Sequence, residues 1–219
     1  MLELIQFLYV QRIKGFAVPS APHFDSETTS QWFEQKLQAS KRYLEFGSGG
    51  STYLAAKLNK PFVCIDSDRF FLRAVTQKIT ADGYLNPTSQ SYLPRNIGLT
   101  REWSQPVVWG ALSQRRQASF RHYSDFQTES LQQIDYPDLI LVDGRFRVAC
   151  ALKAIRALQA QSNWTLVVDD YVGRPEYEVI AEFAKLDCFV GRMAVFCSTI
   201  TRTKAELDNA IQAYELDFR

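Results

Sequence analysis

The chain has 219 residues, enough for one large domain or for one domain with an appended segment. Hydrophobic residues make up 46% and charged residues 22%, which excludes collagen-like, low-complexity and wholly disordered proteins. With 25 Lys and Arg against 24 Asp and Glu, the net charge of +1 predicts neither a nucleic-acid partner nor attraction to a membrane surface. No apolar run reaches the ~20 residues of a membrane-spanning helix, and the first residues lack the order of a secretory signal. We therefore expect a cytoplasmic protein.

The four cysteines are dispersed at positions 64, 150, 188 and 197, each within an apolar run and without any C-x-x-C pair. This pattern predicts buried free thiols, with disulfides or zinc ligands as the weaker alternatives.

Residues 1–40 are expected to form an N-terminal helical cap. A helix is predicted near 2–13, then a loop at 18–22, then a second helix over Ser26–Ala39.

A regular alternation of strands and helices follows over residues 41–200, and a C-terminal helical tail over 201–219. Strands are expected at 43–46, 61–66, 89–97, 138–144 and 165–170. Helices are expected at 51–59, from 148 to 158 and from 175 to 186. A further helix is expected to begin after a cap at Ser67 or Asp68, and another to lie before residue 134. Residues 188–190 and 193–198 flank a tight turn and predict a hairpin.

Strands that alternate with helices predict an α/β fold with a doubly wound, mostly parallel sheet. Ligands of such sheets lie beyond the carboxyl ends of the strands. The residues that follow the predicted strands are polar, charged or glycine-rich: 47–52, Asp66, 96–103, 143–147 and 169–171.

Gly47, Gly49 and Gly50 lie between a strand and a helix, where glycine lets the backbone approach a ligand closely. A dinucleotide fingerprint requires glycine at position 52, which is Thr52, and a plain tight turn is the alternative. Asp66 ends the second strand, where a carboxylate binds ribose hydroxyls or else caps the next helix.

The segment Leu44-Glu45-Phe46-Gly47-Ser48-Gly49-Gly50-Ser51-Thr52 resembles the first motif of the class I S-adenosylmethionine-dependent methyltransferases. The resemblance implies a Rossmann-like, seven-stranded sheet ending in an antiparallel hairpin, with S-adenosylmethionine as the cofactor. It also implies the cofactor-binding residues: Glu45, Gly47, Ser48, Gly49, Gly50, Ser51 and Thr52 at the methionine part, Asp66 and Ser67 at the ribose, Asn96 and Ile97 at the adenine, and Asp143. Ser51 departs from the family's frequent third glycine, and no acidic residue ends the third strand.

The segments Asp143-Gly144-Arg145-Phe146-Arg147 and Asp169-Asp170-Tyr171 are similar to an uncharacterised bacterial methyltransferase-like group. They are more distantly similar to the macrocin-type sugar O-methyltransferases, a likeness that implies Mg²⁺ or Mn²⁺ held by Asp143, Asp169 and Asp170. Alternatively, Arg145 and Arg147 compensate these carboxylates and make a metal unnecessary, or bind an anionic substrate by bidentate hydrogen bonds. Solvated charges are the remaining alternative.

We expect methyl transfer from S-adenosylmethionine to an oxygen of a small molecule or sugar, with Asp143, Asp170 and Arg145 acting at the acceptor. His122 is a weaker candidate base, and Trp103 and Trp109 are read as core residues rather than stacking platforms. A non-catalytic binding module on the same fold is the main alternative, and an NAD(P)-linked oxidoreductase a lesser one. A homo-oligomer stays open.

Overall fold

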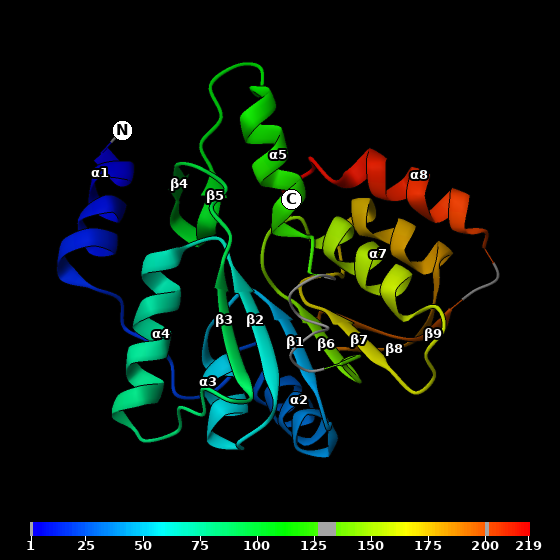
Figure 1. Cartoon of the computed structure of the whole chain (residues 1–219), viewed down its shortest axis with the longest axis horizontal. Helices are drawn as coiled ribbons and strands as arrows, with labels where there is room; N and C mark the ends of the chain where they lie inside the picture. Colours follow the sequence, from blue (N-terminus) through cyan, green and yellow to red (C-terminus); the bar gives the residue numbers. More distant parts are fainter. Residues whose placement is uncertain (1, 127–134, 200–201) are drawn as a thin grey trace.

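The computed structural model describes residues 2–126, 135–199 and 202–219 (Figure 1). The predicted boundary between residues 200 and 201 lies outside the described residues. Within these ranges, the main sheet has seven strands in the order β3-β2-β1-β6-β7-β9-β8. Their bounds are β1 Tyr43–Phe46, β2 Phe62–Asp66, β3 Gln90–Pro94, β6 Leu139–Val142, β7 Thr165–Val168, β8 Ala184–Val190 and β9 Met193–Thr199. The first five run parallel, and β9 pairs antiparallel with both β7 and β8. The predicted fold class is confirmed.

The central strands are short, and every residue in them is covered. β1, β2 and β6 are buried along their whole length, as parallel strands with helices on both faces must be. Successive side chains point to opposite faces, so Leu44 and Phe46 join one core and Tyr43 the other.

Helices cover both faces of the sheet (Figure 1). One core includes residues of α5 (Gln114–Tyr123), α7 (Arg147–Leu158) and α8 (Lys204–Tyr214), and the other includes residues of α2 (Glu27–Ala39), α3 (Gly50–Lys57) and α4 (Arg69–Ala81). Side-chain oxygens cap several helices: Ser26 accepts from the Thr29 amide, and Asp68, rather than Ser67, accepts from Phe70 and Phe71.

The N-terminal helix α1 (Leu2–Tyr9) continues into a π-helical turn, η1 (Val10–Lys14). It packs on α4 through an edge-on contact of the Phe16 and Phe71 rings, 5.2 Å between centroids, and through Arg12 over the Phe70 ring. Together with the small β4–β5 hairpin and α5, it lies at the end of the sheet where β2 gives way to α4 (Figure 1). That end is the carboxyl edge of the parallel strands.

The connection after β3 forms the antiparallel pair β4 (Thr100–Arg101) and β5 (Gln105–Pro106), joined by η2 (Glu102–Ser104). Arg116 of α5 donates to the carbonyls of Leu99 (3.1 Å) and Val107 (2.7 Å), which fixes this hairpin to the helix. Trp103 and Trp109 are exposed, at 80% and 77% of their surface, so the expectation that they are core residues is wrong.

Two further expectations are corrected. The predicted helix 175–186 is a 3₁₀ segment, η3 (Pro175–Glu182), because Ala184 and Lys185 already pair with β9. All four cysteines are free thiols as predicted, but only Cys64 and Cys150 are buried, since Cys188 lies exposed on the outer strand β8.

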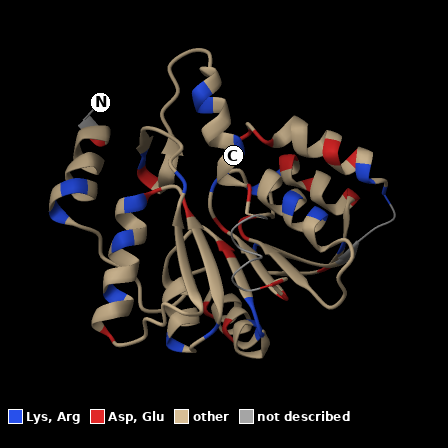
Figure 2. Ribbon diagram, viewed as in Figure 1, with Lys and Arg blue, Asp and Glu red and all other residues tan. Residues whose placement is uncertain are grey.

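Figure 2 shows basic and acidic residues on helices and strands in several parts of the ribbon. In the part of the chain that the structure describes, no helix has the length and apolar character required to cross a membrane.

Candidate functional site

The turn after β1 is shaped by its glycines. Gly47 has φ of 97°, and a Cβ on it would lie 2.7 Å from the Gly144 amide nitrogen. A Cβ on Gly50 would overlap the carbonyl oxygen of Ala21, so the loop of the N-terminal cap covers the start of α3. Gly49 differs, because nothing lies within 4 Å of a Cβ built there. The turn therefore presents an open backbone face at Gly49.

Glu45 is fully buried directly before this turn. Its carboxylate accepts hydrogen bonds from the hydroxyls of Ser51 and Thr52 (2.6 Å for Thr52), and Thr52 also accepts from the Gly49 amide (2.9 Å). Burial raises the pKa of Glu45 to about 7, although the two hydroxyls oppose the shift. Glu45, Ser51 and Thr52 thus shape the turn from inside the protein. Ser51, the departure from the glycine pattern, is one of the two donors.

Asp66, at the end of β2, holds the same turn from the other side. Its Oδ2 accepts from the amide (2.7 Å) and the hydroxyl of Ser48, and its Oδ1 accepts from the Asp68 amide (2.7 Å). Burial raises the pKa of Asp66 to about 6, against these hydrogen bonds. A carboxylate oxygen can accept two hydrogen bonds, and Oδ1 accepts one among the described residues.

A cavity of about 550 Å³ lies beside Asp66, at the ends of β2 and β3. Its lining includes two predicted cofactor residues, Ser67 and Asn96, while Ile97 is fully buried in the core instead. Gln11 and Arg12 of η1 form its outer wall, and Gln11 donates to Asp68 (2.7 Å). The cap therefore closes this cavity on the side away from the sheet.

The carboxylates after β6 and β7 surround Arg147, the first residue of α7. Arg147 donates to Asp143 Oδ1 (3.1 Å) and to the backbone carbonyls of Asp143 (3.1 Å), Gly144 (3.0 Å) and Asp169. A cation at a helix N-terminus is disfavoured by the helix dipole, and these acceptors offset that placement.

The carboxyl groups of Asp143 and Asp169 are close enough for each to influence the pKa of the other. Partial burial raises the pKa of Asp143 above its ordinary value; Arg147 opposes the shift and the Asp169 charge adds to it. The pKa of Asp169 is raised by the same kind of burial. A carboxylate with a raised pKa is a stronger base than an ordinary one.

Asp170 has a different environment, since three guanidinium groups approach it. Arg192 lies 2.8 Å from its Oδ1, and Arg147 and Arg174 lie 3.5 Å from its Oδ2. Its backbone is in the left-handed region, with φ of 53°, which places the side chain among these arginines.

The donor set does not fit a metal ion. Among the described residues, no three His, Cys, Asp or Glu side chains gather in a way that could hold one. The guanidinium of Arg147 forms ion pairs with both Asp143 and Asp170. Of the alternatives considered for Asp143, Asp169 and Asp170, the geometry favours compensation by arginine.

Several contributors were not expected. Arg174 follows Asp170 by four residues, a spacing that could have indicated the pair. Arg192 lies in the β8–β9 turn, which the antiparallel pairing of Val168 with Ala194 brings to the end of β7. Tyr123 of α5 approaches the Arg145 amide (3.4 Å), and no local pattern signals that contact. The Nε2 atom of His122 lies 2.7 Å from the guanidinium of Arg95.

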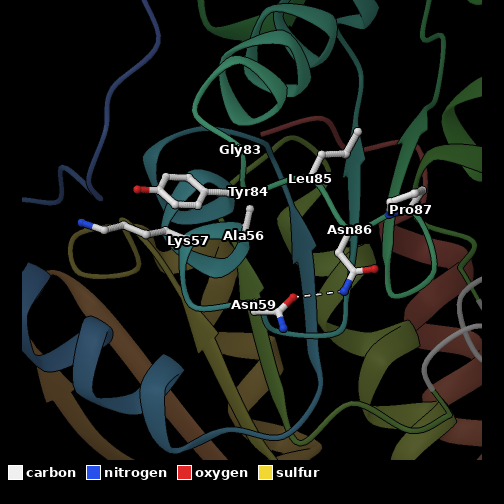
Figure 3. A pocket seen from close by; sticks show the side chains of 8 residues that line it. All are labelled: Ala56, Lys57, Asn59, Gly83, Tyr84, Leu85, Asn86 and Pro87. Carbon is white, nitrogen blue, oxygen red and sulfur yellow. Dashed lines mark hydrogen bonds between the residues drawn. The ribbon is translucent and has the colours of Figure 1, made fainter.

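A second, smaller cavity of about 290 Å³ lies at the opposite edge of the sheet, before β2 and β3 (Figure 3). Its side chains include Asn59 and Asn86, which bond to each other at 3.1 Å, and Lys57 is its single charged lining residue. Its lining therefore contains no acid–base pair. The candidate acid–base residues lie instead at the carboxyl ends of the parallel strands.

No protein-family model and no curated protein matches the chain. Among solved structures, it is similar to a methyltransferase-like protein from Silicibacter pomeroyi, with 27% identity and a TM-score of 0.73, over 92% of this chain and 100% of that one. An O-methyltransferase from Bacillus cereus in complex with SAH has 15% identity and a TM-score of 0.42, over 98% and 77% of the two chains. An SAH-bound methyltransferase from Podospora anserina has 14% identity and a TM-score of 0.42, over 97% and 75%. These last two are too distant to carry an argument.

Proposed function

We propose that this chain, which has the fold of the class I S-adenosylmethionine-dependent methyltransferases, binds S-adenosylmethionine and methylates an oxygen of a small molecule or sugar. One observation carries the proposal. The open glycine turn at Gly49, the buried Asp66 and the 550 Å³ cavity lie at the adjoining ends of β1, β2 and β3. The carboxyl edge of a doubly wound sheet is where such a ligand binds.

The residues suit the parts of the cofactor in turn. Ser67 and Asn96 line the cavity and would contact the adenosine part. The open position on Asp66 Oδ1 would accept a ribose hydroxyl, and the bare backbone at Gly49 admits the methionine part. Glu45, Ser51 and Thr52 act indirectly, because they fix the turn from behind.

The bound cofactor supplies an activated methyl group, so the protein's task is to position the acceptor and remove its proton. The acceptor oxygen forms the new bond to the methyl carbon, and the carbon–sulfur bond breaks with its electrons left on sulfur. Asp143 is best placed to take the hydroxyl proton, because its side chain is 35% exposed and its pKa is raised. Asp170 orients the surrounding arginines instead, since three guanidinium groups neutralise it. No metal enters this scheme.

Calorimetry of the full chain with S-adenosylmethionine and with NAD⁺ tests the first half of the proposal. We expect saturable binding of the former alone; binding of NAD⁺ alone would overturn it in favour of an oxidoreductase. Transfer of labelled methyl groups to a panel of hydroxyl compounds, with Mg²⁺ and with chelator, tests the second half. Transfer that survives the chelator supports the scheme, whereas cofactor binding without turnover on the whole panel would indicate a binding module.

A further inference from the structure

Four guanidinium groups, those of Arg145, Arg147, Arg174 and Arg192, lie near the ends of β6 and β7. Arg147 forms ion pairs with Asp143 and Asp170, and Arg174 and Arg192 each form one with Asp170. Among the residues that the structure describes, none donates or accepts a hydrogen bond with the Arg145 side chain, and none forms an ion pair with it.

Arg145 lies in surroundings that disfavour a lone positive charge. It is half-buried, and the charges nearest to it include those of Arg147 and Arg174. Desolvation and the proximity of these two cations lower the pKa of Arg145. Tyr123 and Tyr177 stand beside it and supply no negative charge at neutral pH. An anion bound here would relieve this repulsion.

The position of Arg145 assigns that anion to the acceptor. The neighbours of Arg145 come from α5, α7 and the segment after β7, whereas the cavity of 550 Å³ is lined from the ends of β2 and β3 and from the cap. In the sheet order, β1 separates β2, at the cavity, from β6, which Arg145 follows. The Gly47–Gly144 contact joins them, so a methyl group delivered over that contact would meet an acceptor held on the β7 side.

We propose that Arg145 binds an oxyanion of the acceptor, a carboxylate or a phosphate, and so selects anionic hydroxyl compounds over neutral ones. The planar guanidinium offers two parallel donors to either group. Arg174 contributes at the rim, since it is partly exposed and also donates to the Tyr177 hydroxyl (3.2 Å). The identification of the anion as part of the acceptor rests on the proposed function. The anion site itself does not.

Titration of the full chain with inorganic phosphate and with acetate tests the site without any methyl transfer. The Nε–Hε resonance of Arg145, identified by its loss in Arg145→Gln, is followed by NMR. We expect saturable movement of this resonance, at least tenfold weaker binding in Arg145→Gln, and partial recovery in Arg145→Lys. Arg115→Gln, an exposed arginine on α5, is the matched control and should leave the affinity unchanged. An unmoved resonance, or equal losses in both variants, would overturn the proposal.

The second arm identifies the source of the anion. Glucose 6-phosphate and glucuronate are compared with glucose as methyl acceptors. Preferred methylation of one of the two anionic compounds, lost in Arg145→Gln through a higher KM for that compound, supports the assignment and distinguishes phosphate from carboxylate.

A separate measurement compares the affinities of Arg145→Gln for S-adenosylmethionine and for 5′-methylthioadenosine, which lacks the carboxylate. A tenfold loss confined to the former would assign Arg145 to the cofactor's own carboxylate and overturn the acceptor assignment. If the protein binds the cofactor but not phosphate, only this inference is refuted. If it binds phosphate but not the cofactor, only the proposed function is refuted.

Discussion

Gly47 and Gly144 pack backbone against backbone, so closely that a Cβ on Gly47 would lie 2.7 Å from the Gly144 nitrogen. The two residues follow the neighbouring strands β1 and β6. Tyr123 closes the same contact, because a Cβ on Gly144 would overlap its hydroxyl. The turn proposed to hold the cofactor and the turn that carries Asp143 and Arg145 are therefore fixed relative to each other by the absence of side chains.

Gly49 and Gly50 are expected to respond differently to alanine. Gly49→Ala meets open space on extended backbone (φ 169°), so its free energy of unfolding should stay within about 0.5 kcal/mol of the parent. Its affinity for S-adenosylmethionine should fall, because the added methyl group occupies the face proposed for the ligand. Gly50→Ala must displace the Ala21 carbonyl and should lose about 1–3 kcal/mol of stability. Urea unfolding and calorimetry measure both quantities, and unchanged cofactor affinity in Gly49→Ala would remove this face from the site.

Asp66→Ala should weaken cofactor binding about 10- to 100-fold, the range of a lost hydrogen bond to a charged group. Ser48→Ala is the control, because it removes one hydroxyl donor to Asp66 and leaves the carboxylate in place. Calorimetry with S-adenosylmethionine measures both variants. If Asp66→Ala binds as tightly as the parent, the ribose assignment is wrong.

Asp143→Asn should lower kcat more than it weakens cofactor binding, because it removes the base and keeps the shape. In the parent, kcat should fall as the pH drops through the raised pKa of Asp143. Asp169→Asn removes a neighbouring negative charge that raises this pKa, so the inflection should move to lower pH. The pH profile of kcat for the parent and Asp169→Asn measures the shift, and an unmoved inflection would exclude Asp143 as the titrating base.

Glu45 should make stability depend on pH. The pKa of Glu45 in the folded state, about 7, lies above the ordinary 4.5. Its contribution to the free energy of unfolding is therefore fully present below pH 4.5 and is lost as the pH rises through 7. The difference corresponds to about 3 kcal/mol. The unfolding free energy of the parent relative to Glu45→Gln should therefore decline by about that amount between pH 4.5 and pH 8. Glu27→Gln, an exposed carboxylate in the first turn of α2, controls for loss of a negative charge. A constant difference across this range would contradict the prediction.

Arg147→Met should destabilise the protein by about 1–3 kcal/mol, because it removes a buried guanidinium and leaves the carbonyls of Asp143, Gly144 and Asp169 without that donor. Arg156→Met removes a partly exposed pair with Asp208 and should cost about 0–1 kcal/mol. Urea unfolding in the presence of chelator compares the two. If the parent loses as much stability on chelation as it does on loss of Arg147, a metal rather than the arginine balances the cluster.

The strands were predictable because burial on both faces leaves a continuous apolar signal. Tyr43–Phe46 matches β1 at both ends, and the runs around β6 and β7 extend beyond those strands by no more than two residues. The segment 175–186 was misread because its apolar spacing suits a helix, while the β8–β9 hairpin begins at Ala184, four residues before the predicted strand at 188. The turn at 191–192 predicts the hairpin, but not how far its first strand extends.

The candidate site was predictable where a single turn holds it, as at Gly47 and Asp66. It was not predictable where contacts join distant turns. The sequence suggested Arg147 as a partner for the carboxylates. It did not show that the side chain reaches Asp143 and Asp170 together, and this contact is what argues against a metal. The packing of Ala21 over Gly50 likewise has no counterpart in either local sequence.

The N-terminal cap contacts this edge of the sheet at two places. Gln11 of η1 donates to Asp68 beside the cavity, and Asp25 accepts from the Arg192 amide (2.9 Å) beside Asp170. Residues 11–25 therefore connect the cofactor side and the acceptor side of the proposed site, and a deletion between the two contacts is expected to disturb both sides together.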